Sequence, residues 1–125
     1  MDPIVEYSTI SNSKVLIRTF KSLGTMNHII DSWQYVIDHK ILEENQIGVI
    51  SDFRDADLQV NMTDLELLKN YYNSHSELFG KIKVAQVVDS PKIVYPILYE
   101  LKNSKYNSKP FSKLEATIDW VQEKE

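Results

Sequence analysis

The stretch "IGVISDFRDADLQVNMTDLELL", residues 47–68, contains a strand, a turn and the start of a helix, and it decides the fold class. Its first six residues form a short apolar run that ends in a carboxylate, as expected of a strand covered on both faces. Thr63 and Glu66 have the spacing of a capping box, so a helix is expected to begin there. A buried strand that leads into a helix indicates a parallel α/β sheet.

The rest of the chain continues this alternation. Two extended segments, "IVEYS" from Ile4 and "KVLIRTFKS" from Lys14, flank a serine and asparagine turn and predict an antiparallel hairpin. Further strands are expected at "KIKVAQVVD", from Lys81, and at "SKPF", residues 108–111. We therefore predict one domain over residues 1–125, with a mostly parallel sheet of four to five strands, an antiparallel N-terminal strand and about four helices.

Helices are predicted where apolar residues recur every three or four positions. The first runs from about Thr25 to about Ile41, the second ends at Gly80 as a left-handed terminator, and a last one begins at a second capping box formed by Ser112 and Glu115. Between residues 90 and 95 the chain is expected to form a loop, with a helix beginning near residue 96, because two prolines interrupt the helical ladder. The residues expected to be buried against the sheet are Leu65, Leu68, Ile118 and Val121.

Composition narrows the functional classes. The 125 residues include no cysteine, which excludes disulfides and thiolate sites and favours a reducing compartment. The start of the chain resembles no signal peptide, and no apolar run approaches the ~20 residues that span a bilayer, so the cytoplasm is expected. A net charge of −4 argues against a nucleic-acid partner.

Four of these features together resemble the SpoIIAA-like group of STAS domains, which is related in fold to bacterial anti-sigma-factor antagonists and, more loosely, to Sec14-type lipid-binding domains. The features are the N-terminal hairpin, "IGVISDFRDADL", "KIKVAQVVDSPKIV" and the ending "KPFSKLEATIDWV". The resemblance covers nearly the whole chain and implies a SpoIIAA-like (STAS) α/β fold. It implies less about function, because a shared fold does not give a shared activity.

In the antagonists, the resemblance implies a phosphorylatable serine in an Asp-Ser-Ser-Gly loop at the start of the helix after the second central strand. The corresponding residues here, 60–64, read "VNMTD" and contain neither a serine pair nor a glycine. Their hydroxyl group, on Thr63, is assigned to the capping box. A phosphorylation switch of that kind is therefore not expected.

Asp52, Asp55 and Asp57 follow a predicted strand, at the edge where ligands of open α/β sheets bind. One interpretation is a cation site or a receiver-like phosphoacceptor with Lys109 as its basic partner. A receiver also needs an acidic pair after its first strand, which this chain lacks, and magnesium binds poorly to one reliable carboxylate. The favoured interpretation is a solvated turn in which Arg54 pairs with a neighbouring carboxylate, so no metal is expected.

No enzyme or cofactor motif is found. The three histidines lack metal-pair spacing, the three glycines are isolated rather than clustered around a phosphate, and no serine lies in a Gly-x-Ser-x-Gly elbow. Tyrosines are numerous, however, and Tyr71, Tyr95 and Tyr99 could line a cleft beside the loop that follows residue 88. Aromatic residues at helical spacing more often form ordinary core packing.

The sequence therefore predicts a non-catalytic binding domain that docks the segment 55–68 onto a protein partner, with a homodimer among the allowed assemblies. The alternative is a carrier or sensor of a small lipophilic ligand, whose cleft would be gated by residues 90–99. A receiver-like phosphoacceptor is the third and least favoured interpretation. The residues assigned to ligand or partner binding are Asp52, Asp55, Asp57, Thr63, Asp89, Ser90, Ile93, Tyr95 and Tyr99.

Overall fold

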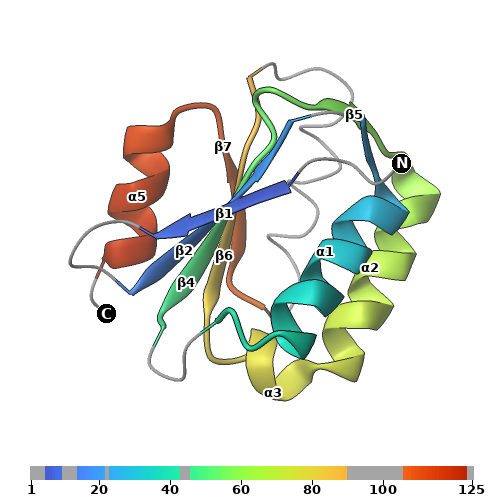
Figure 1. Ribbon diagram of the computed structural model, residues 1–125, viewed down its shortest axis with the longest axis horizontal. Coiled ribbons are helices and arrows are strands. Elements are labelled where there is room, and N and C mark those ends of the chain that lie inside the picture. Colours follow the sequence, from blue (N-terminus) through green and yellow to red (C-terminus); the bar gives the residue numbers. More distant parts are fainter. Residues whose placement is uncertain (1–4, 10–13, 22, 43–45, 90–105, 124–125) are drawn as a thin grey trace.

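A five-stranded sheet forms the centre of the computed structural model, which describes residues 5–9, 14–21, 23–42, 46–89 and 106–123. Its strands lie in the order β1-β2-β4-β6-β7 (Figure 1). β1 pairs antiparallel with β2, and every other neighbouring pair is parallel. The predicted fold class is confirmed. The strands are β1 (Val5–Thr9), β2 (Val15–Phe20), β4 (Gly48–Asp52), β6 (Lys83–Val87) and β7 (Ser108–Phe111).

Helices cover both faces of this sheet. Two helices that run in the same direction, α1 (Met26–Asp38) and α2 (Met62–Ser74), lie side by side on one face, and the short α3 (Ser76–Phe79) follows α2 (Figure 1). α5 (Leu114–Gln122) lies on the opposite face. None of the helices in the described part of the chain is long and apolar enough to cross a membrane.

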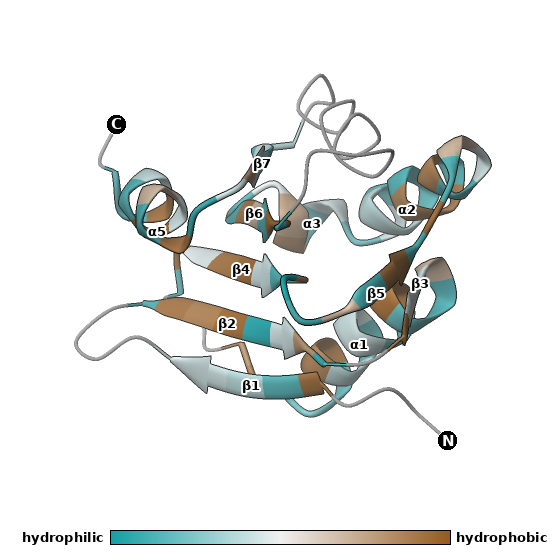
Figure 2. Cartoon of the chain, turned by 90° about the horizontal axis from the view of Figure 1, so that it is seen from above, coloured by the Kyte–Doolittle hydropathy of each residue, from teal (hydrophilic) through white to brown (hydrophobic). Residues whose placement is uncertain are grey.

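Two apolar clusters hold these layers together, one on each face of the sheet. The larger cluster lies under α1 and α2 and includes Trp33, Leu65 and Leu68; the smaller lies under α5 and includes Ile50 and Val121. Figure 2 shows the apolar stretches of β2, β4 and β6 between the helical layers. The predicted burial of Leu65, Leu68 and Val121 is confirmed, and Ile118 is half-buried against the smaller cluster.

A second, two-stranded sheet was not predicted. β3 (Leu23–Thr25) pairs in parallel with β5 (Asp57–Gln59), just after the chain leaves β2 and β4. Both strands have only three residues, which is too short for a period-two pattern to be recognised. This small sheet joins the segments that lead into α1 and α2.

The N-terminus of α2 differs from the prediction. Asn61, not Thr63, is the N-cap, and its side chain accepts a hydrogen bond from the Asp64 amide at 3.0 Å. The Asp64 carboxylate in turn accepts from the Asn61 amide at 3.1 Å, which completes the capping box two residues earlier than expected. Asparagine and aspartate are at least as effective in these positions as threonine and glutamate, so the pattern allowed both choices.

Three other helix ends differ in part from the prediction. Lys113 is the N-cap of α5 without a side-chain cap bond, so the Ser112 and Glu115 capping box does not form. α1 ends at Asp38 rather than near Ile41. The helical segment ends at Gly80 as predicted, but Gly80 has a φ of −78° and is right-handed, so it is not a left-handed terminator. The predicted loop at 90–95 and the helix from residue 96 lie outside the described residues.

Candidate functional site

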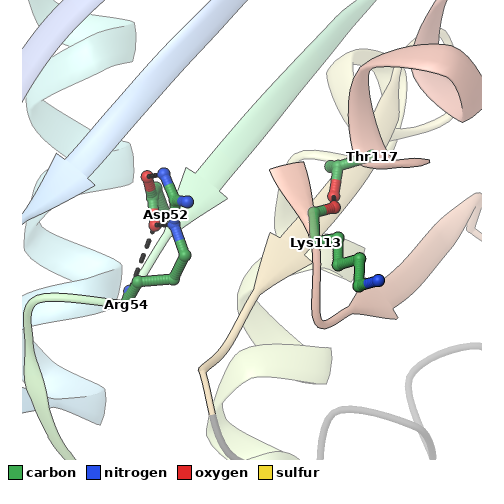
Figure 3. A network of polar contacts seen from close by, with 4 residues as sticks. All are labelled: Asp52, Arg54, Lys113 and Thr117. Carbon is green, nitrogen blue, oxygen red and sulfur yellow. Dashed lines mark hydrogen bonds and ion pairs between the residues drawn. The ribbon is translucent and has the colours of Figure 1, made fainter. Parts of the chain in front are cut away.

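The carboxyl end of β4 carries a closed ion pair between Asp52 and Arg54 (Figure 3). Arg54 Nε donates to Asp52 Oδ1 at 2.9 Å, Arg54 Nη2 donates to Oδ2 at 2.8 Å, and the Arg54 amide also donates to Oδ1. These bonds raise the pKa of Arg54. The predicted pairing of Arg54 with a neighbouring carboxylate is confirmed, but Asp52 is 7% exposed and therefore lies in a buried position rather than in a solvated turn.

The other two aspartates of this segment do not join Asp52 at a common site. Asp55 and Asp57 are exposed, and the Asp57 carboxylate accepts a hydrogen bond from Gln59. No group of three potential metal ligands occurs among the residues that the structure describes. The three aspartates therefore form no common site, although they lie within six residues of one another in the sequence.

The proposed basic partner of a phosphoacceptor lies elsewhere. Lys109 pairs in register with Ala85, whose side chain belongs to the α5 face, and its Nζ lies 5.3 Å from the centre of the Phe111 ring. On α5, Thr117 donates a hydrogen bond to the Lys113 carbonyl at 2.7 Å, which forms a polar contact separate from Asp52 and Arg54 (Figure 3). Within the described ranges, no ion pair joins Lys109 to Asp52, so the receiver-like arrangement has no support in the geometry.

The start of α2 presents a different kind of surface. The Met62 side chain is 57% exposed and that of Leu67 is 49% exposed. Thr63 is also exposed, and its hydroxyl donates to Asn61. Thr63 and Leu67 are four residues apart and so lie on one face of the helix, with Met62 beside them at its first turn. These three residues, here called the α2 surface, combine apolar contact area with one hydroxyl.

The remaining predicted residues add little to either region. Asp89 is exposed just after β6. Ser90, Ile93, Tyr95 and Tyr99 lie outside the described residues. Tyr71, which was expected beside that cleft, is half-buried and donates a hydrogen bond to Gln34 on α1 at 3.0 Å. Its desolvation raises the pKa of the phenol to about 12.

A row of polar side chains that the sequence analysis missed crosses the face covered by α1 and α2. Arg18 on β2 lies in register with Ser51 on β4, and Ser51 lies in register with Gln86 on β6. The three side chains are 1%, 1% and 4% exposed. We call Arg18, Ser51 and Gln86 the central polar row. It lies within the larger apolar cluster, where polar groups are costly unless they are hydrogen-bonded.

Arg18 is held by neutral groups and aromatic rings. Its Nε and Nη2 donate to Ser51 Oγ at 3.3 and 2.7 Å, and its Nη1 donates to the Ser32 hydroxyl at 3.0 Å and to the Ile29 carbonyl at 3.4 Å. The guanidinium carbon lies 3.9 Å from the centre of the Trp33 ring, which is a cation–π contact. Burial lowers the pKa of Arg18 to about 10, so the side chain remains charged near neutral pH.

The sequence contained a signal for this row. In each central strand the residues that face α1 and α2 read apolar, polar, apolar with a period of two. The three triplets are Leu16, Arg18 and Phe20; Val49, Ser51 and Phe53; and Val84, Gln86 and Val88. Only pairing in register shows that the three polar members are neighbours.

Comparison with known proteins finds solved structures of similar fold. No protein-family model matches the sequence, and no curated protein matches it. An uncharacterized protein of the DUF3478 family with a SpoIIAA-like fold, from Shewanella loihica PV-4, superposes with a TM-score of 0.62 at 11% identity, over 95% of this chain and 93% of that one.

Two other similar structures are antagonists of anti-sigma factors. One is an anti-sigma factor antagonist from Mycobacterium paratuberculosis, with a TM-score of 0.62 and 12% identity over 97% of this chain and 95% of that one. The other is SpoIIAA in its unphosphorylated form, with a TM-score of 0.57 and 11% identity over 95% and 96% of the two chains. At this identity the likeness establishes architecture rather than activity. The chain has the SpoIIAA-like fold of STAS domains.

Proposed function

We propose that the protein is a non-catalytic regulatory domain that binds a protein partner through the α2 surface and the adjoining loop, residues 55–68. The observation that carries this proposal is the exposure of Met62 and Leu67 at the start of a helix whose other apolar residues are buried or half-buried. Large exposed apolar side chains beside polar ones are typical of protein contact sites. The cytoplasmic location remains a prediction.

The comparisons support this proposal at the level of the fold. Two of the similar structures are anti-sigma factor antagonists, which by name act on another protein. Residues 60–64 lack the phosphorylatable serine pair that the family resemblance implies. We therefore propose that docking does not depend on a phosphorylation switch. Asp55 and Thr63 would make polar contacts with the partner, and Met62 and Leu67 would make the apolar ones.

Site-specific photocrosslinking in cells tests this proposal. A benzophenone amino acid placed at Leu67 is expected to form an adduct with one protein, and the matched probe at Ile47 is expected to form none. Ile47 is a suitable control because its side chain is 41% exposed. It directly precedes β4, whereas the segment 55–68 follows the other end of that strand. An adduct of twice the monomer mass would identify a second copy of this chain as the partner. Equal adducts from both positions, or none from Leu67, would contradict the proposal.

The carrier hypothesis stays a prediction. Its gating segment, residues 90–99, lies outside the described part of the chain. Amide exchange tests it directly: exchange across residues 90–95 is expected to be fast in the free protein and slow once a lipid-like ligand is added. Slow exchange in the free protein would argue against a gate there.

A further inference from the structure

Arg18 is a buried cation without a carboxylate partner among the described residues. Its guanidinium carries five N–H groups, and the four hydrogen bonds given above leave one Nη2 hydrogen without an acceptor there. The bonded acceptors are two hydroxyls and a carbonyl, none of which carries a charge. An uncompensated charge in an apolar interior is costly, so an anion that reached this position would be strongly favoured.

Two further groups of the central polar row have unused hydrogen-bonding capacity. Ser51 Oγ already accepts from Arg18 Nε and Nη2, so its own hydrogen is available as a donor. Gln86 Nε2 donates to the Ser108 hydroxyl at 3.0 Å, while Gln86 Oε1 is buried and has no hydrogen-bond partner among the described residues. Because a hydroxyl can either accept or donate, rotating the Gln86 amide by 180° keeps the Ser108 bond and turns N–H donors toward the free side.

All three side chains of the row line one small cavity. Its volume is about 20 Å³, slightly more than the space that one water molecule needs and too small for a hydrocarbon chain, so a larger polar group would enter only as the lining side chains move apart. The rest of its wall is largely apolar and comes from the sheet, both helices and the segment after β5, including Met26, Phe53, Leu58, Leu65 and Leu68. The cavity therefore combines a cation that has no carboxylate partner among the described residues, one available hydroxyl hydrogen and one adaptable amide with a largely apolar lining.

We propose that this cavity binds one carboxylate group. Its two oxygens match the two kinds of donor available, the free Nη2 hydrogen of Arg18 and the Ser51 hydroxyl, and its single charge balances that of Arg18. A phosphate dianion would carry a second negative charge, and no cation other than Arg18 is among the described residues that line the cavity. The carboxylate belongs either to a free short acid or to the end of a longer apolar acid that enters between the helices.

Titration of the wild-type protein observed at the Arg18 Nε–H resonance tests this site. Sodium acetate is expected to produce a saturable shift and a rise in Tm, because it binds only the native state. Acetamide, the neutral isostere of acetate, is expected to produce neither effect. Sodium chloride at the same ionic strength is the control for charge screening by salt, and it also shows whether a monatomic anion binds. If octanoate binds more tightly than acetate while octanol does not bind, a longer acid is the source.

Variants separate binding from general effects of charge. Ser51→Ala removes one donor to the ligand and is expected to weaken acetate binding by about tenfold, the usual effect of one hydrogen bond to a charged group. Arg18→Met is expected to abolish binding. Lys21→Met is the matched control, because it removes an exposed cation just after the same strand and leaves the cavity intact.

Three results would overturn the proposal. The first is an equal response to acetate and acetamide, which would indicate a cavity that simply holds water. The second is a shift that follows ionic strength without saturating, and the third is loss of the response in Lys21→Met. If Arg18→Met does not fold, the titration of the wild-type resonance and the acetate affinity of Ser51→Ala still test whether the cavity binds a carboxylate.

Discussion

The two faces of the central sheet are built from the same strands but differ in kind. Under α5, the buried side chains of the sheet are mostly small or branched apolar residues, such as Val15, Ile50 and Ala85, and the buried Asp52 at the end of β4 is paired with Arg54. Under α1 and α2, the alternate residues of the same strands include the central polar row. These three side chains line a cavity. The comparison shows that each face has one buried charge, but Asp52 on the α5 side is paired with Arg54, whereas Arg18 on the other side has no carboxylate partner among the described residues.

The largest expected effect comes from the face under α1 and α2. Leu68→Ala removes a side chain that is 3% exposed and is expected to lower the free energy of unfolding by about 2–5 kcal/mol, through lost burial and a cavity. Urea denaturation measures this loss. Leu67→Ala on the same helix is the control and should change stability by less than about 0.5 kcal/mol. Equal losses in both variants would mean that α2 packs through a different face.

The face under α5 can be tested by adding a methyl group. A Cβ at Gly48 would collide with the Val121 side chain and lie 2.9 Å from the Lys83 carbonyl oxygen. Gly48→Ala is therefore expected to cost about 1–3 kcal/mol by overpacking. At Gly24 the nearest atom is the end of the Leu58 side chain at 3.1 Å, which can move, so Gly24→Ala should cost less. A reversal of this order in thermal denaturation would contradict the close packing of α5.

A double-mutant cycle sharpens the comparison at the polar row. Ser51→Ala leaves two guanidinium N–H groups without their acceptor and is expected to cost about 1–3 kcal/mol. In an Arg18→Met background those donors are absent, and the same substitution should cost less than about half as much. Chemical denaturation of the four proteins gives the coupling energy. A coupling of zero would mean that the two side chains do not support each other.

The smallest expected effect concerns the carboxyl end of β4. Millimolar magnesium or calcium is expected to leave the Tm unchanged, because Arg54 already occupies both oxygens of Asp52. A cation that bound only the native state would raise it by mass action. A rise of several degrees that disappears in Asp52→Asn would restore the cation interpretation.

Most of the fold could be predicted from sequence because the strands and helices are encoded locally. Each strand of the five-stranded sheet was expected within a few residues of its position, and "SKPF" matches β7 residue for residue. Period-two and helical patterns come from side-chain directions that the backbone itself imposes. Helix ends were less predictable, since Asn61 and Thr63 are both good caps and only the path of the chain selects one.

The sequence by itself determined the alternation of strands and helices, the apolar stripes of α1, α2 and α5, and the pairing of Arg54 with a neighbouring carboxylate, which the structure identifies as Asp52. Only the tertiary structure decided that Arg18, Ser51 and Gln86 are neighbours, and that Asp55 and Asp57 are not partners of Asp52. The physical reason is register. A shift of one residue between strands turns every side chain to the opposite face, and that alignment depends on packing across the whole sheet.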